Sequence, residues 1–156
     1  MNELAYIPRH FRKCVKYKNL IKFNDFKDNE KLNQACLSAY KNVQMGCEWS
    51  HSIHTVQIKK KKAYTLKTSE SVLVNNLIIN NISSKYRTKS VDRDTTIRLL
   101  ISHIKDSYAF TVHRLDVKSF YESFDRRSIL NKLKSDAKLS RKTISTLVNL
   151  FHELDD

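Results

Sequence analysis

Apolar side chains recur three and four positions apart in several stretches of this sequence, which is the spacing of one face of an α-helix. One such stretch begins at Asn29 and ends before Gly46, a residue type that commonly stops a helix. A second begins at Thr68 or Ser69, whose hydroxyls suit a helix start, and a third begins near Asp94. The apolar positions that support these helices are Leu32, Cys36, Tyr40 and Val43; Leu73, Leu77, Ile78 and Ile82; and Ile97, Leu100, Ile101 and Ile104.

Two further helices are predicted near the end of the chain. Asp125 and Ser140 each precede one of them, and their side-chain oxygens can accept the free backbone N–H groups of a first turn. Residues 1–28 contain apolar groups without a clear period, so they are predicted to form an irregular segment. The apolar positions of the last two helices are Ile129 and Leu133, and then Ile144, Leu147, Val148 and Phe151.

Extended structure is predicted at two places. Residues 53–58 and 63–66 flank a run of four lysines, which favours a hairpin with a charged tip. Residues 109–117, AFTVHRLDV, are apolar and rich in β-branched neighbours, as is typical of a buried strand. The order of helices, hairpin, helices, strand and helices predicts an α+β fold that is mostly helical with a few strands.

The charge of the chain narrows the choice of partner. Its 156 residues include 29 Lys and Arg against 16 Asp and Glu, a formal charge of +13. This excess favours a polyanion, most simply nucleic acid. With one glycine and one proline, the chain lacks the glycine-rich loops that hold phosphates in nucleotide-binding domains. No run of about 18 uncharged apolar residues is present, so no membrane partner is expected.

The cysteines indicate a reducing compartment. Three of them, in a chain without an export signal, predict free thiols and a cytoplasmic location. Cys47, His51 and His54 have the spacing C-x₃-H-x₂-H, which offers three zinc ligands. A fourth ligand is missing and the spacing fits no familiar zinc finger, so coincidence is the favoured interpretation.

The stretch with the clearest chemistry is RLDVKSFYESFD, residues 114–125. Asp116 stands at the end of the predicted strand, where a carboxylate is held rigidly enough to be a metal ligand for phosphoryl transfer. A Mg²⁺ site would need a second acid from elsewhere. Spacing alone favours the other interpretation, a partly exposed acid beside core aromatic residues.

This stretch resembles the first catalytic motif of reverse transcriptases, particularly those of the bacterial retron, abortive-infection and defence-associated groups. Their pattern is Asp, an aliphatic residue, two variable residues, Phe, an aromatic residue, a variable residue, Ser, an apolar residue, and Asp or Asn. Every defined position is met between Asp116 and Asp125, with Phe124 in place of the more usual Ile. Residues 85–105 are similar to the basic fingers segment that precedes the motif in these enzymes.

The resemblance covers residues from about 50 to 135 and implies part of a right-hand polymerase, the fingers and the start of the palm. It divides the chain into an N-terminal helical extension (1–48), a fingers-like basic region (49–108) and the start of the palm (109–156). The implied activity is RNA-directed DNA polymerisation by two-metal nucleotidyl transfer, in antiviral defence. The implied partners are an RNA template and primer and deoxynucleoside triphosphates, with Mg²⁺ as cofactor.

The same resemblance assigns roles to individual residues. Asp116 would bind the catalytic Mg²⁺ pair, helped by the backbone carbonyl of Val117. Tyr121 falls where the family places a steric gate, whose ring excludes a ribose 2′ hydroxyl. In the family a Lys or Arg of the fingers contacts the phosphates of the incoming nucleotide, although a solvated basic helix face explains such residues equally well. The candidates for this contact are Lys89 and Arg93, with Arg87 and Arg98 as alternatives.

The lysine run has two leading interpretations, a solvated hairpin tip and a nucleic-acid-binding site whose lysines neutralise phosphates and release counterions. Nearby, Tyr64 and Tyr86 could stack on bases of a single-stranded template or belong to the core. The lysines concerned are Lys59, Lys60, Lys61 and Lys62.

The second half of the family's metal site has no counterpart in the sequence. The family supplies it from a Tyr-x-Asp-Asp hairpin several tens of residues after the first Asp, and only 40 residues follow Asp116 in this chain of 156. The chain is therefore expected to be the fingers and first palm element of a longer enzyme, inactive by itself. Two other functions stay open: a non-catalytic basic module that binds RNA or DNA, and a structural partner of a separate polymerase chain.

Overall fold

The computed structural model of the chain describes residues 3–58, 61–88, 93–106, 111 and 124–155. Within these residues the chain is mostly helical and has one two-stranded antiparallel sheet, so the α+β prediction is confirmed at this level. The predicted strand at 109–117 lies, apart from residue 111, outside the described residues. The elements in chain order are α1 (Pro8–Lys13), α2 (Tyr17–Lys22), the 3₁₀ helix η1 (Asn24–Lys27), α3 (Asn29–Gln44), β1 (Ile53–Ile58), β2 (Lys61–Leu66), α4 (Ser69–Tyr86), α5 (Arg93–Lys105), α6 (Arg126–Asp136) and α7 (Arg141–Asp155).

Capping side chains mark the starts of the longer helices. The Thr68 hydroxyl accepts the N–H of Ser71 at 3.4 Å before α4, and the Ser140 hydroxyl accepts the N–H of Thr143 at 3.2 Å before α7. The carboxylate of Asp28 accepts two backbone N–H groups of the first turn of α3, at 2.8 and 3.2 Å. Each of these bonds satisfies donors that a helix leaves free at its N-terminus, so the predicted starts of α4 and α7 are confirmed.

The prediction of an irregular segment at residues 1–28 is wrong, because α1, α2 and η1 occupy much of it. The side chain of Phe11 is fully buried, and those of Cys14 and Asn19 are nearly so. Helices of four to six residues are not stable alone and depend on packing against the rest of the protein. Their apolar positions span too few turns to produce a helical period in the sequence.

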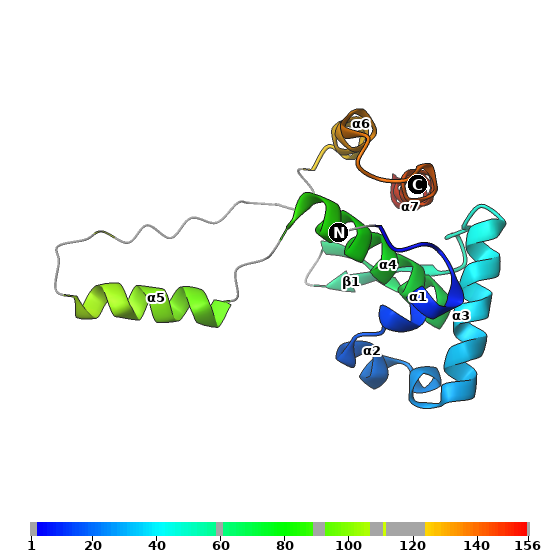
Figure 1. The fold of residues 1–156 in the computed structure, drawn as a ribbon, viewed down its shortest axis with the longest axis horizontal. Helices are drawn as coiled ribbons and strands as arrows, with labels where there is room; N and C mark the ends of the chain where they lie inside the picture. The colour runs from blue at the N-terminus through cyan, green and yellow to red at the C-terminus, as the bar shows by residue number, and fades with distance from the viewer. Residues whose placement is uncertain (1–2, 59–60, 89–92, 107–110, 112–123, 156) are drawn as a thin grey trace.

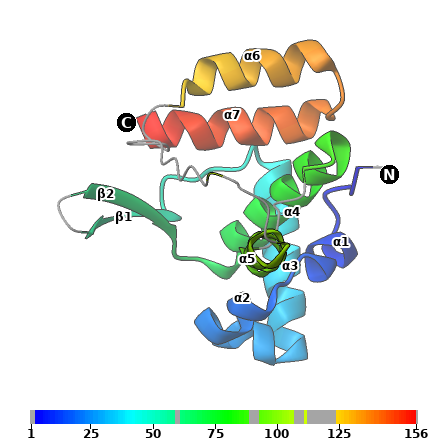
Figure 2. The ribbon, with the colours of Figure 1, turned by 90° about the vertical axis from the view of Figure 1, so that its left-hand side faces the viewer.

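The hydrophobic core lies between α1, α3 and α4, and the antiparallel pair α6–α7 lies across one side of it (Figure 2). Full burial of a Val, Leu or Phe side chain contributes about 1.5–3 kcal/mol to stability. The most deeply buried apolar side chains include Phe11, Ala39, Val43, Trp49, Leu73, Val74 and Leu77.

Two buried asparagines of α4 connect the N-terminal segment to this core. Asn81 accepts the N–H of Leu4 at 2.8 Å and donates to the carbonyl of Leu4 at 3.0 Å. Asn76 donates to the carbonyl of Cys14 at 3.1 Å and to the side-chain oxygen of Asn19 at 2.9 Å. A buried amide is costly unless its hydrogen bonds are made, so these contacts define where the N-terminal segment lies on α4.

Glu3 extends the connection to the start of α7. Its carboxylate accepts the N–H of Ser140 at 2.7 Å and the hydroxyl of Ser140 at 2.9 Å, and it also accepts the hydroxyl of Thr143. Asn81 donates to the same carboxylate at 3.3 Å. A negative charge at a helix N-terminus also interacts favourably with the helix dipole. One acidic side chain therefore joins the N-terminal segment, α4 and α7.

Two elements extend away from the body of the protein. The β1–β2 hairpin projects beyond the helices (Figure 2), and α5 stands apart from the other helices (Figure 1). The predicted apolar face of α5 is exposed at each of its four positions, which are Ile97, Leu100, Ile101 and Ile104.

Replacing Asn81 with alanine is expected to lower the free energy of unfolding by about 2–3 kcal/mol, because both partly buried backbone groups of Leu4 lose their partner. Urea denaturation followed by circular dichroism measures the loss. The matched control is Asn131→Ala on the exposed surface of α6, which should change the value by no more than about 0.5 kcal/mol. Equal effects of the two substitutions would contradict the role given to Asn81.

A second prediction concerns Tyr6, which is buried and donates its hydroxyl to Thr143 at 3.0 Å. Burial raises the pKa of Tyr6 to about 12 from an ordinary value of 10.0. Its raised pKa therefore contributes stability that is complete below pH 10 and is lost as the pH rises from 10 to about 12. At pH 11 the native protein should have lost about 1 kcal/mol more than a Tyr6→Phe variant, each relative to its own stability at pH 9. Parallel pH profiles of the two proteins in urea denaturation would contradict this.

Candidate nucleic-acid interface

The predicted hairpin is confirmed, with one difference in its length. β1 pairs with β2 from Ile53 opposite Leu66 to Ile58 opposite Lys61, so β2 begins two residues before the predicted Ala63. The backbone of Lys61 thus belongs to the sheet and not to the tip. Lys59 and Lys60, which connect the strands, lie outside the described residues.

Lys62 and Tyr64 lie two residues apart on β2 and therefore share one face of the hairpin. The ammonium of Lys62 lies 5.3 Å from the centre of the Tyr64 ring, a cation–π contact. The Tyr64 side chain is 41% exposed. Proteins that bind single-stranded nucleic acid use cations to contact phosphates and aromatic rings to stack on bases. An exposed lysine beside an exposed tyrosine ring offers both.

The base of the hairpin is held by contacts that sequence reasoning missed. The ammonium of Lys22 on α2 donates to the Thr65 hydroxyl at 3.0 Å and to the Leu66 carbonyl at 2.9 Å. The hydroxyl of Tyr64 donates to the carbonyl of Leu154, near the end of α7, at 3.4 Å. Partners 43 to 90 positions apart leave no local pattern in a sequence. The hairpin is thus fixed to both the N-terminal and C-terminal parts of the protein.

Most residues of the predicted polymerase site fall where the structure gives no description. Lys89, Asp116, Val117 and Tyr121 lie outside the described residues. Arg93 is the first residue of α5, and its side chain is not described. Their predicted roles therefore stay predictions.

The two alternative arginines of the fingers segment are both exposed. Arg87 follows α4 in the left-handed conformation, with φ of 51°. Arg98 lies on α5, which stands apart from the body (Figure 1). Both residues are exposed, as expected for a solvated basic surface or for phosphate contacts.

Asp125, the last position of the motif, is a helix cap, as predicted. Its carboxylate accepts the N–H of Arg127 at 3.0 Å and the hydroxyl of Ser128 before α6. These hydrogen bonds lower the pKa of the Asp125 carboxyl, and the bond from the Ser128 hydroxyl has the largest effect. The capping role accounts for an Asp at this position without a metal.

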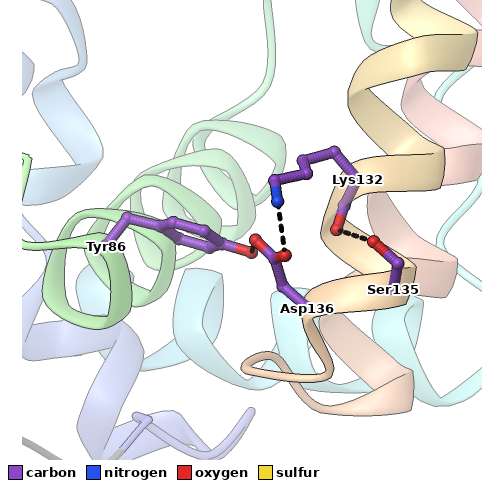
Figure 3. Close-up of polar contacts among 4 residues, drawn as sticks. All are labelled: Tyr86, Lys132, Ser135 and Asp136. Atoms are coloured by element: carbon purple, nitrogen blue, oxygen red, sulfur yellow. Dashed lines mark hydrogen bonds and ion pairs between the residues drawn. The ribbon is translucent and has the colours of Figure 1, made fainter.

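Tyr86 belongs to a structural contact between α4 and α6 (Figure 3). Its hydroxyl donates to Asp136 at 3.0 Å, and the other oxygen of Asp136 lies 2.9 Å from the ammonium of Lys132. The hydrogen bond from Lys132 lowers the pKa of Asp136, and desolvation raises the pKa of Tyr86. The ammonium of Lys138 lies 4.9 Å from the centre of the Tyr86 ring. A lysine ammonium lies over one face of each ring, Lys138 on Tyr86 and Lys62 on Tyr64. Tyr64 is the more exposed of the two tyrosines, so it is the better candidate for stacking.

The described residues do not form a metal site. No group of three or more His, Cys, Asp or Glu side chains comes together among them. Burial raises the pKa of the Cys47 thiol to about 12, which disfavours the thiolate that zinc requires, while His51 and His54 are exposed. Trp49, which lies between Cys47 and His51 in the sequence, is a core residue that is 1% exposed.

Comparisons with protein-family models, with curated proteins and with solved structures give no match to this chain. Among the described helices, none combines the length and the apolar character needed to cross a bilayer.

Alanine substitution of all four hairpin lysines, residues 59–62, tests the interface. If each lysine neutralises one phosphate, the slope of log K against log salt for a single-stranded RNA oligomer should become shallower by up to about 3. The control changes four exposed lysines of helices α1, α2 and α3, which alters the net charge by the same amount and should affect the slope much less. Those control lysines are Lys13, Lys18, Lys31 and Lys41. Equal salt slopes for the two variants, measured by fluorescence anisotropy, would reject the hairpin as the contact surface.

Proposed function

We propose that this chain supplies the fingers and the first palm motif of a reverse transcriptase, an RNA-directed DNA polymerase of antiviral defence. The observation that carries the proposal is the ten-residue pattern from Asp116 to Asp125, which meets every defined position of the family's first catalytic motif. A basic chain of formal charge +13 and a hairpin with an exposed lysine beside an exposed ring support a nucleic-acid substrate.

The proposed roles follow the chemistry of each side chain. The carboxylate of Asp116 and the carbonyl of Val117 would provide oxygen ligands, the kind that Mg²⁺ prefers. The ring of Tyr121 would exclude a ribose 2′ hydroxyl and so select deoxynucleotides. Two bound Mg²⁺ ions supply stabilisation of the attacking and leaving oxygens in such enzymes.

The motif by itself does not complete a two-metal site. The motif contributes one carboxylate at its metal-binding position, whereas two Mg²⁺ ions need several oxygen ligands. Catalysis therefore requires carboxylates beyond this one. On this proposal the 156-residue chain binds nucleic acid and a nucleotide but does not polymerise by itself.

A second candidate is a non-catalytic module that binds RNA or DNA. The same hairpin favours it, because the contact of Lys62 with Tyr64 and the net charge serve binding without any chemistry. The two candidates differ in what Asp116 does. In the polymerase it holds a metal ion and a nucleotide, and in the binding module it has no such role.

The deciding measurement is binding of a deoxynucleoside triphosphate to the full chain, with and without Mg²⁺. We expect Mg²⁺-dependent binding that Asp116→Asn weakens by about tenfold or more, because the substitution removes the negative charge of an oxygen ligand that Mg²⁺ prefers. The control Asp106→Asn changes an exposed acid after α5 and should leave binding unchanged. RNA binding should be the same in all three proteins.

Tyr121→Ala adds a test of substrate class, because loss of the ring should raise the affinity for a ribonucleotide relative to the deoxynucleotide. If the native chain binds RNA but shows no Mg²⁺-dependent nucleotide binding, the polymerase proposal fails and the binding module replaces it.

A further inference from the structure

An apolar groove with a volume of about 540 Å³ lies where the end of α6 meets the start of α7. Its lining includes Leu133, Leu139, Ile144 and Val148. The first two are almost fully buried and the last two are half-buried. The groove is large enough to accept several apolar side chains from another molecule.

The charged residues at this groove are all positive. Lys134 and Arg141 line it and are exposed, and Lys138 is exposed in the loop between the two helices. No acidic side chain of the described residues contributes to the lining. The acid closest in sequence to the loop, Asp136, already bonds Tyr86 and Lys132. The site therefore combines an apolar lining with a cationic rim formed by Lys134 and Arg141.

This combination distinguishes between three possible occupants of the groove: nucleic acid, helix α5 of a second copy, and an amphipathic helix of a partner protein. A nucleic-acid backbone would pair with the rim but would leave the apolar lining without a complementary surface. Helix α5 of a second copy has an exposed apolar face, with an acid, Asp94, near its start. Arg98 and Lys105, however, lie one turn on either side of Ile101, so the centre of that face would bring cations against the cationic rim. An amphipathic helix flanked by carboxylates satisfies both parts of the groove.

We propose that this groove, formed by α6 and α7, docks an amphipathic helix of a partner protein. The helix presents apolar side chains at i, i+4 and i+7 to the lining and places glutamate or aspartate beside Lys134 and Arg141. The inference rests on the described surface and not on the polymerase motif, so it stands or falls independently of the proposed function.

The probe is a synthetic peptide of about 18 residues, long enough for a helix of five turns, with leucines at i, i+4 and i+7 and glutamates flanking them. Titration into the full chain, followed by fluorescence anisotropy, should give saturable binding. Two further peptides separate the contributions: one replaces the leucines with serine and keeps the charge, and the other replaces the glutamates with lysine and keeps the apolar face. Both should bind at least about tenfold more weakly.

The protein variant reverses the rim. Lys134→Glu with Arg141→Glu should weaken binding of the acidic peptide about three- to tenfold and strengthen binding of the lysine peptide, since exposed ion pairs of this kind contribute modestly. The matched control, Lys31→Glu with Lys41→Glu on α3, makes the same change in net charge at two exposed positions and should leave both affinities near their native values. Circular dichroism verifies that each variant is folded.

Several results would overturn the inference. The serine peptide binding as tightly as the leucine peptide would mean that the surface attracts any polyanion. Equal binding of the acidic and lysine peptides would remove the role of the rim. A single-stranded RNA oligomer that displaces the acidic peptide by competing for Lys134 and Arg141 would assign this surface to nucleic acid. A dimer of the chain that excludes the peptide from the groove would assign it to a second copy.

Discussion

The arrangement of the protein depends on the hydrogen bonds between the buried asparagines of α4 and the backbone of the N-terminal segment. Asn81 pairs with both backbone groups of Leu4, and Asn76 bonds Cys14 and Asn19. These amides are almost completely buried, so each unmade bond would cost a large fraction of a small domain's stability. Satisfying them requires the N-terminal segment to follow one path along α4. The short helices α1 and α2 form because this path places Phe11 and its neighbours in the core.

The contact between the N-terminal segment and α4 also positions the two proposed binding surfaces. Glu3, held by Asn81, accepts the N–H and hydroxyl of Ser140 at the start of α7 and thereby places that helix on the core. At the other end of α7, the carbonyl of Leu154 accepts from Tyr64 of the hairpin and, at 3.2 Å, from Arg126 at the start of α6. The basic hairpin and the groove of α6 and α7 are therefore both held by contacts with α7. Their proposed partners are different.

Local patterns in the sequence identified the long helices and the hairpin. α3, α4, α6 and α7 each span at least three turns with a cap at the start, and α3 ends before Gly46, whose φ of 107° suits glycine. Of the candidate interface, the lysines of the hairpin were predicted, because strand periodicity and a charge run are visible in a short window. The partners of that hairpin were not predicted, since Lys22 and Leu154 are distant in sequence. The sequence left Tyr86 ambiguous between core and base stacking, because its hydrogen bond to Asp136 of α6 depends on the fold.

By itself, the sequence determined those properties that a few neighbouring residues control. These are the helical and extended periods, the caps such as Thr68 and Asp125, the positive charge, and the motif from Asp116 to Asp125 that carries the proposed chemistry. Only the tertiary structure decided which polar side chains are structural, as with Asn81, Glu3 and Tyr86, and where an apolar lining meets a cationic rim. The physical reason is that burial and hydrogen-bond partnership are properties of residues brought together from distant parts of the chain. The same asparagine or tyrosine is a surface residue or a structural one according to which neighbours the fold gives it.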